Sequence, residues 1–589
     1  MIEIVATPGG EPSLRVDRRF VHSRRDPRTE ARRFLDSQRK ATFHGTIIIV
    51  GAGLGYLTEE ARRAFPGSRV IALHLSPSCR ANSVSRADAT WDPSLGSDAG
   101  AFLLSVLAEE ALPGLLTLFW RPALAAFPEV ARVVEERVHH ALTRLNAGVA
   151  TTGYFGPRWF RNALANYLNI DTWCRLEQTE LPVVVAAPGP SLSRVVPALQ
   201  QARERFVLVA AASALLPLER AGVLPDLVVH QDGGYYSGEH LRHTAAAPQT
   251  AGREDRHGEP TERVVVQPLS ARPLPGRTAP VVWLSYDHPA DVLLRDHADS
   301  PYLDIGQLGT VTATATRLAL TLTTGPVYLA GVDMATRDII SHIRGHSFEE
   351  YHLARSDRMS PLLTTLLARA VDREGADTRR PDGWRVAVDL EIYADWFTMH
   401  ASEGAGNATA AAAAATDTHT GRLRRLEPSP VDLGIPSASL SDLAAHPPME
   451  RSRHRPGESR LAVRRIATPP RQERARRLDA ALERWRGEVT RSISVTPGEP
   501  EVPGAFMRLP GEIRNLARHL ALPEVLRVDR LERGQTQPNE PARKRRHPAE
   551  NGELAEAYRE LRDRLIHTIA RMEEHLRGKR GRVRGSTPE

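Results

Sequence analysis

From Leu181 to Gln201 the chain reads LPVVVAAPGPSLSRVVPALQQ, in which a short continuous apolar run gives way to apolar positions at helical spacing. The run Val183 to Ala186 is typical of a strand buried on both faces, and the later spacing is typical of an amphipathic helix. The turn between them, Pro188 to Ser191, therefore joins a strand to a helix. Turns of this kind at the carboxyl ends of parallel strands are a common place for ligands to bind.

The same alternation of apolar runs and helical patterns continues to about residue 346 and predicts a mostly parallel sheet. The predicted strands of this domain are Val183 to Ala186, Phe206 to Ala210, Leu227 to His230, Val264 to Gln267, Val281 to Leu284 and Val327 to Ala330.

An earlier stretch, GTIIIVGAGLGYLTEEARRAFPGSRVIALHL from Gly45, has the pattern of a Rossmann-like strand–turn–helix–strand unit whose second strand is Val70 to Leu75. Its glycine turn, Gly51 to Gly55, would point backbone N–H groups at an anion. A dinucleotide site usually adds an acidic residue at the end of the next strand, and this chain has His74 there. The pattern favours a structural tight turn over a ligand site.

The predicted fold class is α/β, with two Rossmann-like domains, helical segments and a charged, helical and partly flexible C-terminal tail. The patterns divide the chain into an irregular lead-in (1–40), an N-terminal Rossmann-like unit (41–98), a helical linker region (99–180), an α/β domain (181–346), a helical and loop region (347–446) and a basic part with Pro-rich linkers and charged helices (447–589).

Composition and charge narrow the function classes. No run of about 18 apolar residues predicts a membrane span, and the first residues lack the pattern of a signal peptide. The two cysteines, Cys79 and Cys174, have no metal-like spacing, so a reducing cytoplasm is the simplest compartment. Residues 451 to 589 contain 32 Lys and Arg against 20 Asp and Glu, whereas the rest contains 46 against 51. Nucleic acid is therefore an unlikely partner of the predicted α/β domains.

The turn after the first strand of the α/β domain has the residues of a phosphate or ribose cradle. Gly189 lets a ligand approach the backbone, Pro190 fixes φ, and Ser191 can cap the following helix. A helix N-terminus with a hydroxyl and free N–H groups suits an anion. A helix that is merely capped remains the alternative.

Other chemistry-bearing residues fall at the same predicted edge of the sheet. Asp232 ends a strand in the stretch LPDLVVHQDGGYY, and three further residues, Gly309, Thr310 and Thr314, lie at the start of a small-residue helix in GQLGTVTATATRLALTL. Because open parallel sheets bind ligands at the carboxyl ends of their strands, we expect these residues to face one nucleotide site.

A third loop begins where the last strand of the domain ends. Asp333 follows that strand in VYLAGVDMATRDIISHIRGHSF and is expected to face the same nucleotide site. His342, Arg344 and His346 come after it. The arginine suits a phosphate and a histidine suits a general base. A solvated loop is the alternative for this His-x-Arg-x-His cluster.

Five motifs occur in order: GAGLGY, ALTRLNAGVATTGYFGPRWFRNALANYL, APGPSL, GVLPDLVVHQDGG and GPVYLAGVDMA. Together they resemble the motility-associated-factor (Maf) flagellin glycosyltransferases over roughly residues 40 to 440. The central part resembles the domain called 6-hydroxymethylpterin diphosphokinase MptE-like. That domain is similar to bacterial sialyltransferases of Rossmann-like fold, in which a cytidine nucleotide lies against a Gly-Pro-Ser turn.

The resemblance implies roles for several residues of this chain. Gly189, Pro190 and Ser191 would contact the nucleotide, and Asp232 would lie near the donor. The remaining implied contacts are Gly309 and Thr310 in the same pocket, His342 as the general base and His346 as the second candidate for that base.

The leading hypothesis is a cytoplasmic glycosyltransferase that moves a nonulosonic (sialic-acid-like) sugar from a CMP donor to Ser or Thr of flagellin, with no metal or other cofactor. One alternative is a pterin diphosphokinase that uses ATP and Mg²⁺, with Asp232 and Asp333 as metal ligands. The other is a non-enzymatic scaffold that binds flagellin.

Overall fold

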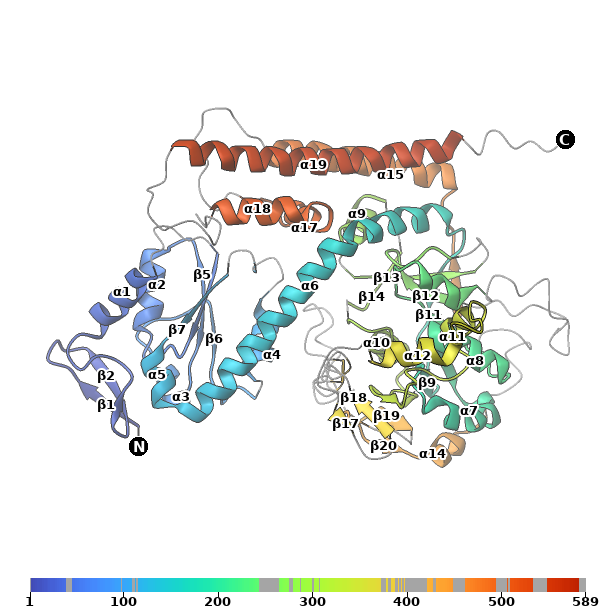
Figure 1. Cartoon of the computed structure of the whole chain (residues 1–589), viewed down its shortest axis with the longest axis horizontal. Coiled ribbons are helices and arrows are strands. Elements are labelled where there is room, and N and C mark those ends of the chain that lie inside the picture. The colour runs from blue at the N-terminus through green and yellow to red at the C-terminus, as the bar shows by residue number, and fades with distance from the viewer. Residues whose placement is uncertain are drawn as a thin grey trace. The chain divides into compact units, whose positions relative to one another are not determined.

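The structure is a computed structural model in which two compact units can be described separately (Figure 1). Unit 1 comprises Met1–Pro157 and Leu482–Glu589, and unit 2 comprises Arg158–Ala481. The residues described are 2–38, 45–96, 98–107, 112, 115–242, 264–274, 279–286, 288–298, 301–306, 308–371, 378–379, 383–386, 390, 393–394, 397, 421–426, 431–448, 461–493, 506, 509–532 and 548–581.

The N-terminal residues of unit 1 form regular structure, so the prediction of an irregular lead-in was wrong. Strands β1 (Ile2–Ala6), β2 (Pro12–Val16) and β3 (Arg19–Phe20) make an antiparallel sheet, and α1 (Pro27–Ser37) follows. Asp26 caps α1 by accepting a hydrogen bond from the N–H of Thr29.

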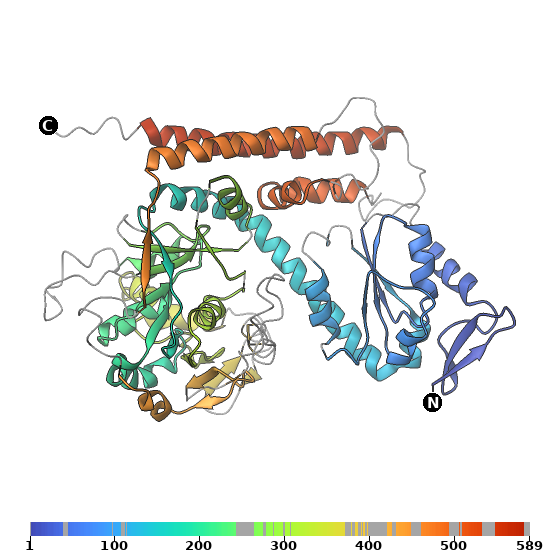
Figure 2. The ribbon, with the colours of Figure 1, turned by 180° about the vertical axis from the view of Figure 1, so that it is seen from behind.

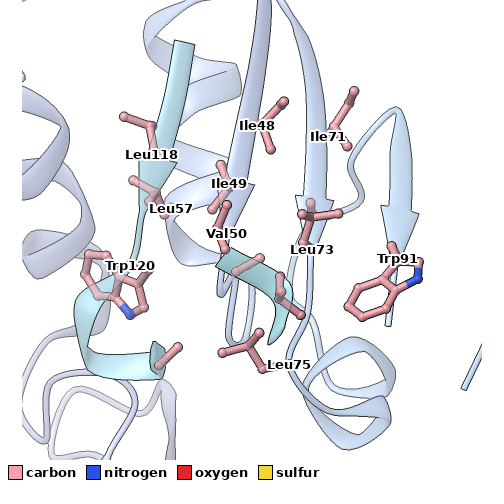
Figure 3. Close-up of a cluster of buried hydrophobic side chains, with 14 of the residues drawn as sticks. Ile48, Ile49, Val50, Leu57, Ile71, Leu73, Leu75, Trp91, Leu118 and Trp120 are labelled. Carbon is pink, nitrogen blue, oxygen red and sulfur yellow. The ribbon is translucent and has the colours of Figure 1, made fainter. Parts of the chain in front are cut away.

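The predicted Rossmann-like unit is present as a four-stranded parallel sheet in the order β6-β5-β4-β7. Its strands are β4 (Thr46–Val50), β5 (Arg69–Leu73), β6 (Ala89–Trp91) and β7 (Leu115–Phe119). Its helices are α2 (Tyr56–Ala64), α3 (Pro77–Ala81), α4 (Ala99–Val106) and α5 (Arg121–Ala126). Figure 3 shows the core of this sheet, where Ile48, Val50 and Leu73 lie among buried apolar side chains.

Side chains of the protein itself contact the glycine turn of this unit, where a ligand would otherwise bind. Nε2 of the buried His22 accepts a hydrogen bond from the N–H of Leu54 at 2.8 Å, and burial lowers the pKa of His22 to about 3. A Cβ on Gly53 would lie 2.3 Å from that same Nε2, and Nδ1 of His74 lies 2.9 Å from the Gly53 carbonyl oxygen. The donors that would serve an anion are thus used internally, as a structural turn requires.

Long helices complete unit 1. Helix α6 (Pro128–Asn169) is continuous in Figure 1 and Figure 2 and passes from unit 1 into unit 2 at Pro157. Helices α17 (Gly511–Leu520) and α18 (Leu522–Glu532) approach α6 closely, because a Cβ on Gly153 would lie 1.9 Å from Leu522. Helices α15 (Arg471–Ser492) and α19 (Pro548–Gly581) lie side by side in both views, and Arg486 pairs with Glu573 at 2.9 Å.

Unit 2 is built on an 11-stranded sheet whose path is β20-β19-β15-β9-β10-β11-β12-β13-β8-β21, with β14 paired to β13. All of its pairs are parallel except that of β8 with β21. The strands are β8 (Trp173–Leu176), β9 (Val183–Ala186), β10 (Val207–Ala211), β11 (Leu227–Val229), β12 (Val264–Pro268), β13 (Val281–Ser285), β14 (Leu303–Asp304), β15 (Val327–Ala330), β19 (Leu423–Leu426), β20 (Ser437–Ala438) and β21 (Val463–Ile466).

Helices cover both faces of this sheet. On one face α7 (Leu192–Gln201) packs through Leu192, Val195 and Leu199, and on the other α10 (Val311–Leu322) packs through Ala315 and Leu318. The remaining elements are α8 (Leu215–Arg220), η4 (Tyr236–Leu241), α9 (Pro289–Ala298), β16 (Thr336–Arg337), α11 (Ser347–Leu353), α12 (Leu362–Val371), β17 (Thr378–Arg379), β18 (Trp384–Val386) and α14 (Leu440–Ala445).

The fold class predicted from the sequence is confirmed, and its details differ in two regions. The range 99–180, expected to be helical, also contains β7 and β8, and the range 347–446 also contains strands β17 to β20. These strands are short, of two to five residues, so a local pattern signals them weakly. In addition β7, β8 and β19 pair with strands distant in the chain, whereas β17 pairs with the neighbouring β18. None of the helices in the described part of the chain is long and apolar enough to cross a membrane.

Candidate functional site

The carboxyl edge of the sheet in unit 2 has a topological switch point between β9 and β15. These strands are neighbours, but β9 leads to α7 on one face whereas α10 enters β15 from the other face. Open parallel sheets bind ligands where connections diverge in this way. The turn Pro188–Ser191 and the loop after β15 therefore meet at the expected place for a ligand.

These two loops are tied to each other by hydrogen bonds. The N–H of Ser191 donates to Oδ2 of Asp333 at 2.7 Å, and the Ser191 hydroxyl donates to Oδ1 of the same carboxylate. The N–H of Gly189 donates to the carbonyl oxygen of Gly331 at 2.9 Å. A Cβ on Gly189 would lie 2.3 Å from that oxygen, so glycine is required here by the close approach of the second loop.

The turn differs from the phosphate cradle expected from the sequence. Pro190 has no N–H, Ser191 donates to Asp333, and the N–H of Leu192 donates to the Gly189 carbonyl at 3.1 Å. The hydroxyl of Ser191 does not cap α7, because it is bonded to Asp333. The protein's own carboxylate therefore occupies the position that an anion would take, and contact of Gly189, Pro190 and Ser191 with a nucleotide stays a prediction.

Asp333 is buried, with 2% of its surface exposed. Burial raises the pKa of its carboxyl group to about 6, although the hydrogen bonds from Ser191 act in the opposite direction. The carboxyl group that links the two switch-point loops therefore changes its charge around pH 6.

A second set of hydrogen-bonded side chains links the residues that follow β11 and β13 to α10. The hydroxyl of Thr314, in α10, donates to Oε1 of Gln231 at 2.9 Å, and the Tyr286 hydroxyl lies 3.3 Å from the same Thr314 oxygen. Thr310 caps α10 by accepting from the N–H of Ala313 at 3.0 Å. Gly309 borders open space with φ +72°, which is compatible with a ligand close to its backbone.

Asp232 lies on the exposed side of the loop that follows β11. Its Oδ1 accepts from the N–H of Gly234 at 2.7 Å. Two asparagines of α6 donate hydrogen bonds to this loop and to the loop that follows β12. Asn162 donates to the carbonyl oxygens of Gly233 and Ser270, both at 3.1 Å, and Asn166 donates to two carbonyl groups in the loop after β12.

The His-x-Arg-x-His segment packs against η4. The rings of His342 and His346 are 5.0 Å apart, and Phe348 lies 4.4 Å from the ring of His240 in η4. Burial lowers the pKa of His346 to about 4, with a smaller effect from the neighbouring His240. The imidazole of His346 is therefore neutral at pH 7, the state that a proton acceptor needs.

The other residues of this segment are fixed by local contacts. The hydroxyl of Ser341 lies 2.9 Å from Nδ1 of His342. Nε of Arg344 donates to Glu349 at 2.6 Å, and 59% of the Arg344 side chain is exposed. A phosphate at Arg344 would therefore use the remaining guanidinium N–H groups.

The residues predicted from the sequence lie in loops at the carboxyl edge of the sheet, and their role in ligand binding stays a prediction. Gln231, Asn162 and Asn166, which contact these loops or the start of α10, were not among them. The asparagines had a signal, since their spacing of four residues puts both on one face of a helix. In the described residues no group of three or more His, Cys, Asp or Glu side chains is arranged to hold a metal ion.

Comparison with known proteins agrees with this architecture. Residues 160–338 match the family model described as 6-hydroxymethylpterin diphosphokinase MptE-like, which confirms the resemblance predicted for the central domain. A solved structure of a MAf glycosyltransferase from Magnetospirillum magneticum AMB-1 is similar over 99% of this chain and 93% of that chain, with a TM-score of 0.52 and 13% identity. The chain therefore has the fold of that protein.

An uncharacterized protein of Treponema pallidum (strain Nichols) is 25% identical over 300 residues. The match covers 50% of this chain and 60% of the relative, so the chain spans less than two thirds of the length of that curated relative.

Proposed function

We propose that the protein is a glycosyltransferase that moves a nonulosonic sugar from a CMP donor to Ser or Thr of flagellin. The observation that carries the proposal is the likeness of nearly the whole chain to a MAf glycosyltransferase, with the MptE-like match lying on the sheet that contains the site. The cytoplasm, where nucleotide sugars and unassembled flagellin meet, is the proposed compartment.

The donor would lie along the carboxyl edge between the switch-point loops and the first turn of α10. Gly309 borders open space, and Thr310 is the N-cap of α10. The partial positive charge of a helix N-terminus favours binding of a phosphate there. Gly189 and Pro190 would supply apolar backbone surface rather than N–H donors, because Asp333 and Gly331 take those of the turn. Asp232, on the neighbouring loop, would face the donor.

Sugar transfer would proceed by displacement at the anomeric carbon of the sugar. The hydroxyl oxygen of the acceptor Ser or Thr forms a bond to that carbon, the bond from that carbon to the phosphate oxygen breaks, and CMP leaves with the bonding electrons. His342 or the neutral His346 takes the hydroxyl proton, and Arg344 stabilises the charge that develops on the phosphate.

A test of this assignment is co-expression with flagellin in cells that make CMP-activated nonulosonic sugars. We expect the intact mass of flagellin to increase by whole sugar units with the wild-type protein and to stay unmodified with His342→Ala. Full modification by His342→Ala would remove His342 as the base, and full modification by a His342→Ala, His346→Ala double variant would reject the whole mechanism.

The name of the matching family model also favours a pterin diphosphokinase. That activity would use Asp232 and Asp333 to bind the Mg²⁺ of ATP. Both carboxylate oxygens of Asp333 accept hydrogen bonds from Ser191, which leaves them poorly available as metal ligands and makes this function the second candidate. Metal-dependent release of AMP from ATP in the presence of 6-hydroxymethylpterin would favour it.

A further inference from the structure

Gln231 is the residue that best fits a direct ligand contact in this site. It follows β11 by two residues and lies on the face of the sheet that α10 covers, beside Asp232 and opposite the first turns of α10. Its side chain is half-buried, so part of it is accessible, whereas Thr314 and Tyr286 beneath it are buried.

The hydrogen bonds among Gln231, Thr314 and Tyr286 leave the Nε2 group of Gln231 available as a donor. Thr314 has one hydroxyl proton, which it gives to Oε1 of Gln231, so the Tyr286 hydroxyl must donate to the Thr314 oxygen. The amide of Gln231 is thereby held by its oxygen. Within the described part of the chain its Nε2 group makes no hydrogen bond, and it carries two protons.

We infer that Gln231 binds the donor nucleotide through its Nε2 group, which donates to an oxygen acceptor of the ligand, and that Thr314 is a positioning residue for this amide. The acceptor oxygen belongs either to the phosphate or to the pyrimidine base, and both kinds of oxygen can accept a hydrogen bond from an amide N–H group. Thr314, expected from the sequence to touch the nucleotide, acts through Gln231 instead. This inference rests on the proposed function, because it assumes a nucleotide donor.

The test uses the full chain and measures the affinities of CMP and cytidine by calorimetry. Gln231→Glu keeps the size of the side chain and an acceptor for the Thr314 hydroxyl, but it replaces the two donor protons by a negative oxygen. We expect CMP to bind at least about tenfold more weakly to this variant. Gln201→Glu, at the exposed end of α7, controls for the added negative charge and should bind as the wild type does.

Thr314 supplies a second, independent arm. Thr314→Val removes the hydroxyl at nearly constant volume and frees the Gln231 amide to rotate, so we expect a loss of about three- to tenfold in CMP affinity. Thr314→Ser restores the hydroxyl and should restore the affinity to within about twofold. A role in packing alone would give the reverse order, because serine leaves the larger void.

The outcomes separate the two ligand oxygens and the two hypotheses. A loss for CMP but not for cytidine assigns the phosphate, and an equal loss for both assigns the base. Wild-type affinity for both ligands in Gln231→Glu overturns the inference while leaving the proposed function intact. Failure of the wild-type protein to bind either ligand rejects the proposed nucleotide donor itself.

Discussion

Asp333 gives the sharpest test of the site geometry, because two opposing effects act on one buried carboxyl group. Burial raises its pKa to about 6, from 3.8, while the two hydrogen bonds from Ser191 lower it. Between about pH 4 and 6 the folded protein therefore holds the proton on Asp333 more tightly than the unfolded chain does. The free energy of unfolding that depends on Asp333 consequently falls as the pH rises through this window and stays low above it.

The magnitude follows from the size of the pKa shift. A shift of about two pKa units corresponds to about 3 kcal/mol, which in a unit of about 320 residues is roughly 4 °C in the unfolding midpoint. Asp333→Asn keeps the geometry, because its amide oxygen can accept from the Ser191 N–H and its NH₂ group can donate to the Ser191 hydroxyl oxygen. This variant lacks the titration. Part of the ~3 kcal/mol is lost below pH 4.5, so we expect its stability relative to the wild type to increase by about 2 kcal/mol from pH 4.5 to pH 7.5.

The assay is calorimetric unfolding of the full chain at several pH values, with the wild type and the variant compared at each. Ser191→Ala serves as the control: it removes one donor to the carboxylate and so raises the pKa of Asp333 further, and its stability should fall over a wider pH range than that of the wild type. A stability difference between Asp333→Asn and the wild type that does not change with pH would show that burial does not raise the pKa of Asp333. So would a difference of opposite sign, because the hydrogen bonds from Ser191 would then outweigh burial.

Other substitutions test separate parts of the account. Gly189→Ala places a Cβ 2.3 Å from the carbonyl oxygen of Gly331, so unit 2 should lose about 2 kcal/mol or more in thermal unfolding, whereas Gly238→Ala, with nothing closer than 3.6 Å, should stay within about 1 kcal/mol. Asn162→Ala leaves two buried carbonyl groups unpaired and should cost about 2 kcal/mol, with faster hydrogen exchange in the loops after β11 and β12; unchanged exchange there contradicts the proposed anchoring. Arg344→Ala should slow sugar transfer, and transfer at the full rate removes Arg344 from the mechanism; because it also takes the guanidinium from the buried carboxylate of Glu349, unit 2 should lose about 1–3 kcal/mol in thermal unfolding.

The strands of unit 2 were the most predictable part of the fold. Val183–Ala186 and Val327–Ala330 were predicted with the bounds that the structure has, because both are continuous apolar runs buried on both faces. The N-terminal sheet was missed because it pairs Ile2 with Val16 in a short hairpin whose outer strand is exposed and alternates apolar and polar residues only over Ile2 to Ile4.

The positions of the candidate site residues in the fold were predictable, but most of their contacts were not. Strand ends at one edge of a parallel sheet follow from topology, which is why Asp232, Asp333 and Thr310 were placed near one another. The bond between Ser191 and Asp333 joins residues 142 positions apart, and no local pattern signals that a carboxylate would occupy the helix N-terminus. Likewise the sequence shows that the strand after the glycine turn of unit 1 lacks the usual acidic residue. It does not show that His22 accepts a hydrogen bond from this turn.

Sugar transfer from a CMP donor is tested most directly by thermal unfolding of the purified protein with CMP and with ATP, each with and without Mg²⁺. A ligand at about 100 times its dissociation constant adds about 2.7 kcal/mol to the stability of the protein that binds it. The account predicts that CMP raises the unfolding midpoint by several degrees whether or not Mg²⁺ is present. No shift with CMP, together with a shift that needs both ATP and Mg²⁺, would contradict the proposed sugar transfer and favour the diphosphokinase.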